Sequence, residues 1–561
     1  MLTTFVVWLI AGFAAFGYAL LCFRPESGHQ SAIGMEPESV AVRLYFGLLL
    51  ISVGLLAIAL LTNISWWLGL ASVVPGIVIA ARHFLSTHYS TPRDSTFSKV
   101  IFFGIGLLIL AFFVSTAEVQ FFDTGLYHQQ MAKWLSDYGL VRGVALLHLC
   151  LGLTSSWFAV AAALNHGLLR GREAAIIGGL PFALMITSSA AVGWRYKRTS
   201  VLPGVRGLTW SLFCGLLLVI SVTWNLESSL SPDIVIWLLP IVTALVLSEP
   251  SPSVSERVGL ALLLSSLVFT VKLSAAPVLA YCGLLWLWHF VRLRSGRRAL
   301  LVYLGLATVV VLVLAVANSR TSGCPLYPSP FACESGESSV GSAFAASIGK
   351  GVRAFASQGN RHMSWFIAAA LTATFIVLKK LWHDSFVFHA LVASWGGIVF
   401  VLITAPNPRF GIGYLLLPVA ISMAISVQWI NRRWPTVLDA ARGFLPWATG
   451  VAALIFLILS IHEANSPLSL LLSNRMASAD GDPIHIVNQK LNMRTTLSLA
   501  KSRLGDIPIV SPKSSDQCWD AAIPCAMETL QSIELREPTQ GLRGGFRRAS
   551  GGSPKNSGVS H

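Results

Sequence analysis

Charged residues are scarce in this sequence. They make up 12% of its 561 residues, whereas hydrophobic residues make up 54% and the mean hydropathy is +0.68. A typical soluble protein carries about 25% charged side chains. The composition therefore excludes an ordinary soluble protein and predicts an integral membrane protein that lies in a lipid bilayer.

Acidic residues and cysteines are also few. The chain has 25 Asp and Glu against 40 Lys and Arg, which gives a formal net charge of +15. In a soluble protein this excess would suggest a nucleic-acid partner, but in a multi-pass protein basic residues collect in cytoplasmic loops, so we expect no nucleic-acid partner. Eight cysteines exclude a disulfide-built scaffold, and the lack of CxxC and HExxH motifs argues against a zinc site.

Long apolar stretches dominate what is present. A transmembrane helix needs about 20 mainly apolar residues to cross roughly 30 Å of hydrocarbon. We identify about fourteen candidate helices: residues 5–23, 44–61, 64–81, 100–114, 174–192, 208–224, 234–247, 258–271, 275–291, 300–317, 365–378, 386–404, 411–430 and 445–461. The predicted fold is an all-α polytopic membrane protein, a bundle of about 14 transmembrane helices with a small C-terminal soluble segment.

Groups of basic residues orient these helices. The five groups are Arg82/Arg93/Lys99, Arg195/Lys197/Arg198/Arg206, Arg292/Arg294/Arg297/Arg298, Lys379/Lys380 and Arg432/Arg433/Arg442. Successive groups are separated by an even number of predicted helices, so all five can lie in the cytoplasm, as the positive-inside rule requires. This holds only if residues 155–169 do not cross, and Asn165 and His166 there favour an interfacial helix. The large polar loops and the C-terminus are then expected outside.

This topology divides the chain into seven parts. They are N-terminal helices (1–117), an outer loop with juxtamembrane helices (118–173), central helices (174–317), a second outer loop (318–364), C-terminal helices (365–461), a small outer cap (462–537) and a disordered Gly/Ser-rich tail (538–561). In the cap, Ile484, Val487 and Leu491 form a helical stripe, and 507–510 is typical of a strand. Cys324 and Cys333 share one outer loop and Cys518 and Cys525 share the tail, so each pair is a disulfide candidate in an oxidising compartment.

The densest polar segment follows the fourth predicted helix and reads Asp123-Thr124-Gly125-Leu126-Tyr127-His128, with Lys133 and Trp134 further on. Asp123 stands where a helix cap would stand, and capping is one interpretation of it. The other is that a carboxylate beside the membrane, with Tyr127 and His128 about one turn along, accepts a proton from an incoming hydroxyl group. The two roles are compatible.

These residues resemble a family of uncharacterised bacterial multi-pass membrane proteins with a DTGLYH outer-loop motif. More distantly, the layout resembles the GT-C superfamily of glycosyltransferases, which use lipid-phosphate sugars as donors. In those enzymes an acidic residue in the first large outer loop is the catalytic base, and Asp123 is the matching position. The resemblance implies location in the bacterial inner membrane.

Four further segments match in order along the chain, one of them at 322–328, and the other three carry charged residues. Asp233, in Ser231-Pro232-Asp233, matches the second acidic motif of the GT-C enzymes, although a helix cap is the plainer interpretation. Lys272 lies between two predicted helices, where it must reach the membrane surface or meet an anion. Arg409, in a Pro-rich turn, could bind a phosphate with its fork of N–H groups while Lys272 supplies a point charge.

The chain departs from the family pattern in one place. After His148 the family has a Gly-Arg pair where this chain has Leu149-Cys150, and an Asn where Thr154 stands, so the role of that Arg cannot be carried over. His148 keeps its place and is a candidate, with Tyr127, for lining an acceptor pocket; a buried structural histidine is the alternative. The resemblance leaves room for a divalent metal bound by Asp123 and Asp233, but no spacing demands a metal or other cofactor.

The resemblance implies a membrane glycosyltransferase that moves a sugar from a polyprenyl-phosphate donor to a glycan, lipid or protein acceptor in the envelope, with inversion. Asp123, His128 and Asp233 would be catalytic, and Lys272 and Arg409 would bind the phosphate. Three alternatives stay open. One is a transporter or flippase of a lipid-linked or polysaccharide substrate, although the sequence shows no convincing internal repeat. The second is a non-catalytic protein that binds envelope glycan. The third is an outer-face polysaccharide polymerase or ligase of another fold, which would usually depend on Arg and His in a late outer loop.

Overall fold

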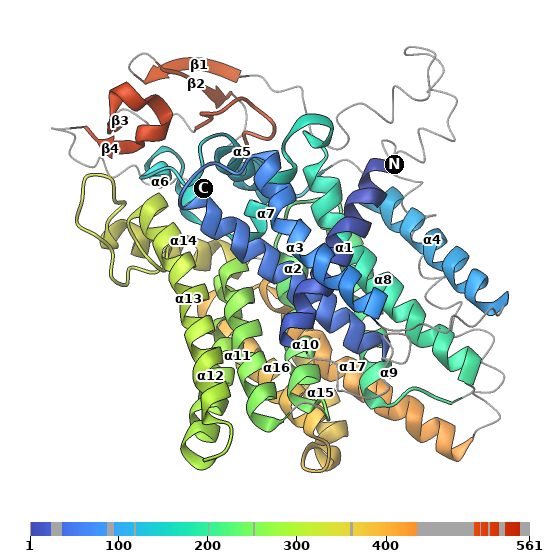
Figure 1. Ribbon diagram of the computed structural model, residues 1–561. Coiled ribbons are helices and arrows are strands. Elements are labelled where there is room, and N and C mark those ends of the chain that lie inside the picture. The colour runs from blue at the N-terminus through green and yellow to red at the C-terminus, as the bar shows by residue number, and fades with distance from the viewer. Residues whose placement is uncertain are drawn as a thin grey trace.

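A computed structural model describes residues 2–23, 36–86, 95–116, 119–199, 201–250, 253–358, 363–434, 499–504, 507–513, 517–526 and 533–549. This part of the chain is mainly helical (Figure 1) and contains eleven helices long and apolar enough to cross a membrane. They are α1 (Leu2–Cys22), α2 (Pro37–Ala59), α3 (Trp66–Ser86), α8 (Glu173–Thr199), α9 (Val205–Thr223), α11 (Val254–Val271), α12 (Ala276–Arg292), α13 (Arg297–Ser322), α15 (Met363–Leu381), α16 (Ser385–Thr404) and α17 (Pro408–Arg433). The chain is a multi-pass membrane protein.

Two further helices are apolar: α4 (Ser95–Ser115), whose side chains are described only from Gly104 onward, and α10 (Asp233–Ser248), which has 16 residues. Thirteen of the predicted stretches therefore coincide with helices. The fourteenth, 445–461, and the predicted helical stripe at Ile484, Val487 and Leu491 lie outside the described residues. The all-α polytopic class is confirmed, and the count of fourteen stays a prediction.

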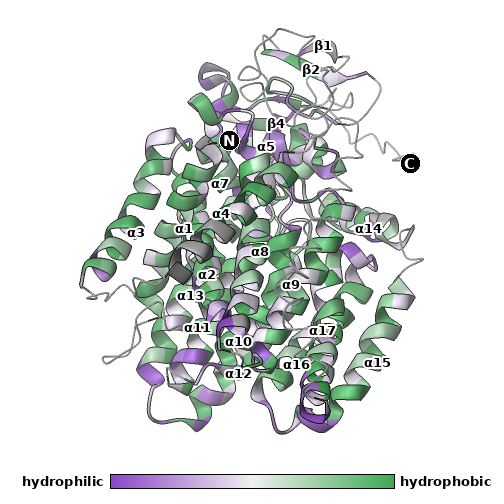
Figure 2. Ribbon diagram, turned by 90° about the vertical axis from the view of Figure 1, so that its right-hand side faces the viewer, coloured by the Kyte–Doolittle hydropathy of each residue, from purple (hydrophilic) through white to green (hydrophobic). Residues whose placement is uncertain are grey.

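Polar residues gather at the two ends of the bundle, with a hydrophobic belt between them (Figure 2). One end, here called the site end, carries the N-termini of α10 and α17. The opposite end carries basic groups at helix termini, where Arg206 bonds Glu249 at 2.7 Å and Arg195 pairs with Glu36. Arg292, Lys380 and Arg433 also lie in terminal turns of α12, α15 and α17 that point away from the site end.

Helix α10 is the centre of the bundle, because every residue from Asp233 to Leu247 is buried. It packs against α17 at close range through Gly413, where a Cβ atom would lie 2.2 Å from the Trp237 carbonyl oxygen. The Trp237 indole also donates a hydrogen bond to the Arg409 carbonyl oxygen at 2.9 Å. Because Gly413 has no side chain, the first turns of α10 and α17 can come into direct backbone contact.

The predicted loop 118–173 folds into short helices at the site end. They are η2 (Thr124–His128, a π-helix), α5 (Gln129–Asp137), α6 (Val144–Leu147), η3 (Leu149–Gly152), α7 (Ser156–Leu164) and η4 (Gly167–Leu169). Helix α7 has nine residues, about 14 Å at 1.5 Å per residue, so it is too short to cross a membrane. Trp157 and Phe158 are buried where α7 packs between α2 and α5, and the interfacial position of this segment stays a prediction.

The C-terminal segment adds two small antiparallel sheets at the site end, β1 (Leu499–Leu504) with β2 (Ile507–Pro512), and β3 (Ile533–Leu535) with β4 (Phe546–Arg548). The predicted strand at 507–510 is confirmed. The prediction that 538–561 is disordered is wrong for 538–548, which form η8 (Pro538–Gly544) and β4. Phe546 is fully buried against Trp134, and this apolar anchor was overlooked among the glycines.

Both predicted disulfides are present, Cys324 with Cys333 and Cys518 with Cys525. The second predicted loop, 318–364, contains an unpredicted helix, α14 (Ser342–Gln358), whose glycines and serines obscured its helical pattern.

We expect Gly413→Ala to lower the free energy of unfolding by about 1–3 kcal/mol, because the new methyl group meets backbone that cannot move aside. Thermal unfolding in detergent measures this. The matched control is Gly396→Ala on α16, where a Cβ would have nothing within 4 Å, and its unfolding temperature should stay the same or rise. Equal unfolding temperatures for the two variants would contradict the close packing of α10 and α17.

Candidate functional site

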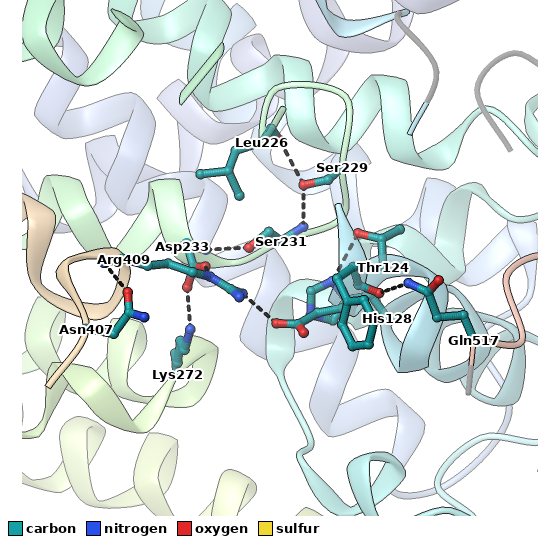
Figure 3. Close-up of polar contacts among 12 residues, drawn as sticks. Thr124, His128, Leu226, Ser229, Ser231, Asp233, Lys272, Asn407, Arg409 and Gln517 are labelled. Atoms are coloured by element: carbon teal, nitrogen blue, oxygen red, sulfur yellow. Dashed lines mark hydrogen bonds and ion pairs between the residues drawn. The ribbon is translucent and has the colours of Figure 1, made fainter. Parts of the chain in front are cut away.

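Four of the predicted residues meet at the site end in one ion network. The Arg409 Nε atom bonds the Asp233 Oδ2 atom at 2.8 Å, and its Nη2 atom bonds the Asp123 Oδ2 atom. The Lys272 Nζ atom bonds the Asp233 Oδ1 atom. Lys272 and Arg409 thus both point to Asp233 (Figure 3). Two carboxylates and two cations make the network neutral in formal charge.

Each member of the network lies at the end of a helix or just outside it. Asp123 precedes η2, Asp233 is the first residue of α10, Lys272 follows the last residue of α11, and Arg409 is in the first turn of α17. The Asn407 side chain caps α17 by accepting a hydrogen bond from the Arg409 backbone N–H at 3.0 Å. The Asp233 backbone N–H donates to the Ser231 hydroxyl at 3.3 Å. These local hydrogen bonds therefore fix the backbone at both Arg409 and Asp233.

The cap interpretations hold only in part. Asp123 is at the N-cap position of η2 but makes no side-chain cap hydrogen bond there, and the cap position of α10 belongs to Pro232, not Asp233. Lys272 meets a carboxylate, that of Asp233, which agrees with the anion-partner alternative. The proximity of the four ions is established, and their catalytic and phosphate-binding roles remain predictions.

Burial and aromatic rings shield the network from water. The Asp233 side chain is 2% exposed, whereas those of Asp123, Lys272 and Arg409 are between 21% and 24% exposed. The Arg409 guanidinium lies over the Phe121 ring at 4.3 Å from its centroid, and the Lys272 ammonium lies over Phe410 at 4.7 Å. Ion pairs are stronger in such surroundings than in water, and both cations gain attraction from the rings.

The pKa values of Asp123 and His128 are both shifted. Burial alone would raise the pKa of the Asp123 carboxyl group, but the Arg409 guanidinium lowers it below its usual range. Asp123 is therefore ionised at neutral pH. Because the folded value is the lower one, this pair stabilises the fold above about pH 4 and loses that contribution as the pH falls through the folded pKa.

His128 is neutral at pH 7, since burial lowers the pKa of its imidazole to about 3 and the Asp123 charge only partly offsets this. Its Nδ1 atom lies 3.3 Å from the Thr124 hydroxyl, and its ring packs on Phe158 at 4.9 Å. The structure gives it a packing role beside Asp123, and a proton-transfer role stays a prediction.

The two residues predicted to line an acceptor pocket differ. Tyr127 is half-buried and its ring contacts His128 at 4.4 Å, close to the network. His148 is buried, its Nδ1 atom accepts a hydrogen bond from the Cys150 backbone N–H at 3.3 Å, and burial lowers its pKa to about 4. This cap on η3 agrees with the structural alternative for His148.

Arg409 also lines an open cavity of about 1020 Å³. Most of its other lining residues are aromatic or amide-bearing: Gln120, Phe121, Phe122, Trp224, Asn225, Trp365, Phe366 and Asn407. Phe122 and Trp365 are 49% and 76% exposed. Asp123, Asp233 and Lys272 are not among the lining residues, so Arg409 is the member of the network that connects it to this cavity.

The described residues contain no group of three or more His, Cys, Asp and Glu side chains that could hold a metal ion. Asp123 and Asp233, the predicted oxygen ligands, share the Arg409 guanidinium. A divalent ion between them would have to displace that cation.

Sequence analysis assigned no role to Phe121, Asn407 or Gln130, yet Phe121 and Asn407 contact Arg409 and Gln130 binds the C-terminal loop at 517–526. One signal was present: Gln130 and Lys133 are three residues apart, so they lie on one face of a helix that also carries buried apolar residues. Paired polar residues on such a face indicate a packed polar partner.

Residues 1–335 match the family model "Domain of unknown function (DUF8201)". The chain belongs to this family. The match includes Asp123, Asp233 and Lys272, and Arg409 lies beyond it. Comparison with curated proteins and with solved structures finds no match.

We expect Asp233→Ala to lower the free energy of unfolding by about 3–5 kcal/mol, because it leaves Lys272 without its carboxylate in a shielded place. Asp233→Leu combined with Lys272→Met should recover part of this loss, since no unpaired charge then remains. The control is Glu334→Gln, which breaks an exposed pair with Arg142 at 3.7 Å and should cost about 0–1 kcal/mol. If Asp233→Ala unfolds at the same temperature as this control, the network does not stabilise the bundle.

Proposed function

We propose that this protein is a membrane glycosyltransferase of GT-C type, in which a sugar moves from a polyprenyl-phosphate donor to an envelope acceptor on the outer face of the bacterial inner membrane. The observation that carries the proposal is the position of Arg409. On one side it lines a cavity rich in aromatic residues, and on the other it holds both carboxylates. A phosphate with a long apolar chain has the chemistry to fit both sides.

The proposed binding step is an exchange of anions at Arg409. A donor phosphate entering from the cavity would accept hydrogen bonds from the guanidinium, which binds phosphate in the same forked geometry as carboxylate. Lys272 adds a second positive charge from the other side of Asp233. The exposed Phe122 and Trp365 at the cavity suit an apolar chain that remains in contact with lipid.

The same exchange would activate the base. While Asp123 pairs with Arg409 its pKa is low, so it binds a proton weakly. Once phosphate takes over the guanidinium, the pKa of Asp123 rises and the carboxylate becomes a stronger base. It then removes the proton of the acceptor hydroxyl as that oxygen bonds to the anomeric carbon, and the bond to phosphate breaks with its electron pair leaving on the phosphate.

The basic residues at the opposite end support the proposed orientation. Arg195, Arg206, Arg292, Lys380 and Arg433 lie there, away from the ion network. By the positive-inside rule, such an end remains in the cytoplasm. The disulfide between Cys518 and Cys525 at the site end fits an oxidising compartment outside.

A transporter is the second candidate, and a cavity of about 690 Å³ at the opposite end favours it. Glu38, Tyr196 and Arg206 are among its lining residues. Helix α10 runs between the two ends with a fully buried core, so movement of a substrate between them would require its displacement.

We expect the purified protein in lipid nanodiscs to transfer sugar from a labelled polyprenyl-phosphate donor to an envelope glycolipid acceptor. Asp123→Asn should lower kcat by about 10²- to 10⁴-fold, the contribution of a general base, and still bind donor. Arg409→Gln should weaken binding of the polyprenyl phosphate itself, measured by native mass spectrometry. Lys379→Gln at the opposite end is the control and should keep full activity.

Normal turnover by Asp123→Asn would refute the proposed base, and unchanged lipid binding by Arg409→Gln would refute the phosphate site. Movement of a labelled lipid across proteoliposomes, without sugar transfer, would favour the transporter. Binding of glycan with neither transfer nor movement would favour a glycan-binding protein.

A further inference from the structure

A disulfide-closed loop from the C-terminal segment covers the turn that carries Asp123. Residues 517–526, here called the tail loop, are closed by the bond between Cys518 and Cys525. The loop is joined to β2, where the Val510 N–H donates to the Pro524 carbonyl at 3.2 Å and the Ala526 N–H donates to the Val510 carbonyl at 3.0 Å.

The tail loop binds the backbone on both sides of Asp123. The Gln517 side-chain amide donates to the Phe122 carbonyl oxygen at 2.8 Å, and the Trp519 backbone N–H donates to the Gly125 carbonyl oxygen at 2.8 Å. Figure 3 shows Gln517 beside the turn that bears Thr124 and His128. The backbone of Asp123 is thus held between two external hydrogen bonds.

Gly125 accepts the Trp519 indole because it has no side chain. A Cβ atom on Gly125 would lie 2.4 Å from the nearest ring atom, closer than atoms can approach. The Trp519 side chain is buried at 2% exposure. The glycine of the Asp123 motif is therefore explained by contact with a residue almost 400 positions later in the chain.

Helix α5, which follows the π-helical turn, completes the attachment of the tail loop. The Gln130 amide donates to the Trp519 and Ala521 carbonyl oxygens at 3.0 Å each. The Lys133 ammonium donates to the Asp520 and Ala521 carbonyl oxygens at 2.7 and 3.0 Å and pairs with the Asp520 carboxylate at 2.7 Å. The side chains of Lys133 and Asp520 are 7% and 10% exposed, so this pair is more shielded than Asp123, Lys272 and Arg409 of the ion network.

The turn held in this way has an uncommon shape. Thr124–His128 is a π-helical turn, with the Gln129 N–H bonded to the Thr124 carbonyl. Such turns are rarer than α-helical ones because their backbone contacts are poorer, so surrounding structure must stabilise them. The tail loop supplies contacts at the residues before and within this turn.

We infer that the tail loop, through Trp519 and the Lys133–Asp520 pair, is a positioning element that holds the π-turn so that the Asp123 carboxylate faces Arg409. The inference rests on the proposed function only in that Asp123 acts in the reaction. Trp519 is a positioning residue, because it contacts the backbone two residues beyond Asp123 and not the reacting groups.

Hydrogen exchange of the full-length protein in nanodiscs tests the attachment without any assay of activity. Trp519→Ala, Lys133→Met, and the double variant Cys518→Ser/Cys525→Ser should each raise amide exchange in residues 122–131 at least tenfold. Trp519→Phe should restore most of the protection. The matched control is Cys324→Ser/Cys333→Ser, which removes the other disulfide and should leave exchange in 122–131 unchanged.

Gly125→Ala supplies a second arm, because the added methyl group should displace Trp519. Alone it should raise exchange as much as Trp519→Ala does. The combination Gly125→Ala/Trp519→Ala should be no worse than either single change, since both act on one contact. Unchanged exchange in 122–131 in the tail-loop variants, or additive effects of these two substitutions, would overturn the inference.

The kinetic arm separates positioning from general stability. Trp519→Ala and Lys133→Met should lower kcat at least tenfold with little change in KM for the donor, because Arg409 and Lys272 remain intact. The acid limb of the pH profile should move to higher pH as Asp123 loses its alignment with Arg409. Raised amide exchange with unchanged kcat in an active protein would overturn the positioning role. A wild-type protein that transfers no sugar would refute the proposed function, and the exchange result alone would then decide the inference.

Discussion

The buried carboxylate of Asp233 is the constraint on which the rest of the site depends. An ion that is 2% exposed must be neutralised by partners with good geometry, and two cations from separate helices do this here. Satisfying Asp233 requires the end of α11, which presents Lys272, to meet the start of α17, which presents Arg409. The contact of Gly413 with Trp237 permits that approach, because it leaves no side chain between α10 and α17.

The two carboxylates and two cations of the network neutralise each other, so an additional anion would compete with a carboxylate for a cation. Arg409 is shared by Asp233, which is buried, and by Asp123, which is partly exposed and stands on a short turn rather than on a long helix. Of the two carboxylates, Asp123 is the one that can be released at lower cost, since water already reaches it. An incoming phosphate would therefore displace Asp123 before Asp233, and the displaced group is the one suited to accept a proton.

Sequence reasoning identified the ions of this site but not their relation. Asp123, Asp233, Lys272 and Arg409 stand out because charged residues next to apolar helices are costly and therefore few. Their pairing could not be predicted, since a helix cap, a snorkelling lysine and an ion pair leave the same trace in a sequence. The apolar helices could be predicted because a helix that crosses the hydrocarbon needs a long, uninterrupted run of apolar residues, which is plain in the sequence. Phe546 and α14 were not predicted, because a single buried aromatic residue or a helix of small residues leaves almost no hydrophobic pattern in the sequence.

The motif around Asp123 encodes two things at once, and only the first could be seen without the structure. Asp123 supplies a charge to the ion network, whereas Gly125, Gln130 and Lys133 make room and hydrogen bonds for the tail loop. A polar motif beside a membrane therefore need not be catalytic throughout. Its residues divide according to what they face. Asp123 faces Arg409 and bears on the proposed chemistry, whereas the residues that face Trp519 and Asp520 bear on how the Asp123 carboxylate is positioned. The distinction follows from geometry, since Lys133 has its charge fully matched by Asp520 and by two carbonyl oxygens and has none left for a substrate.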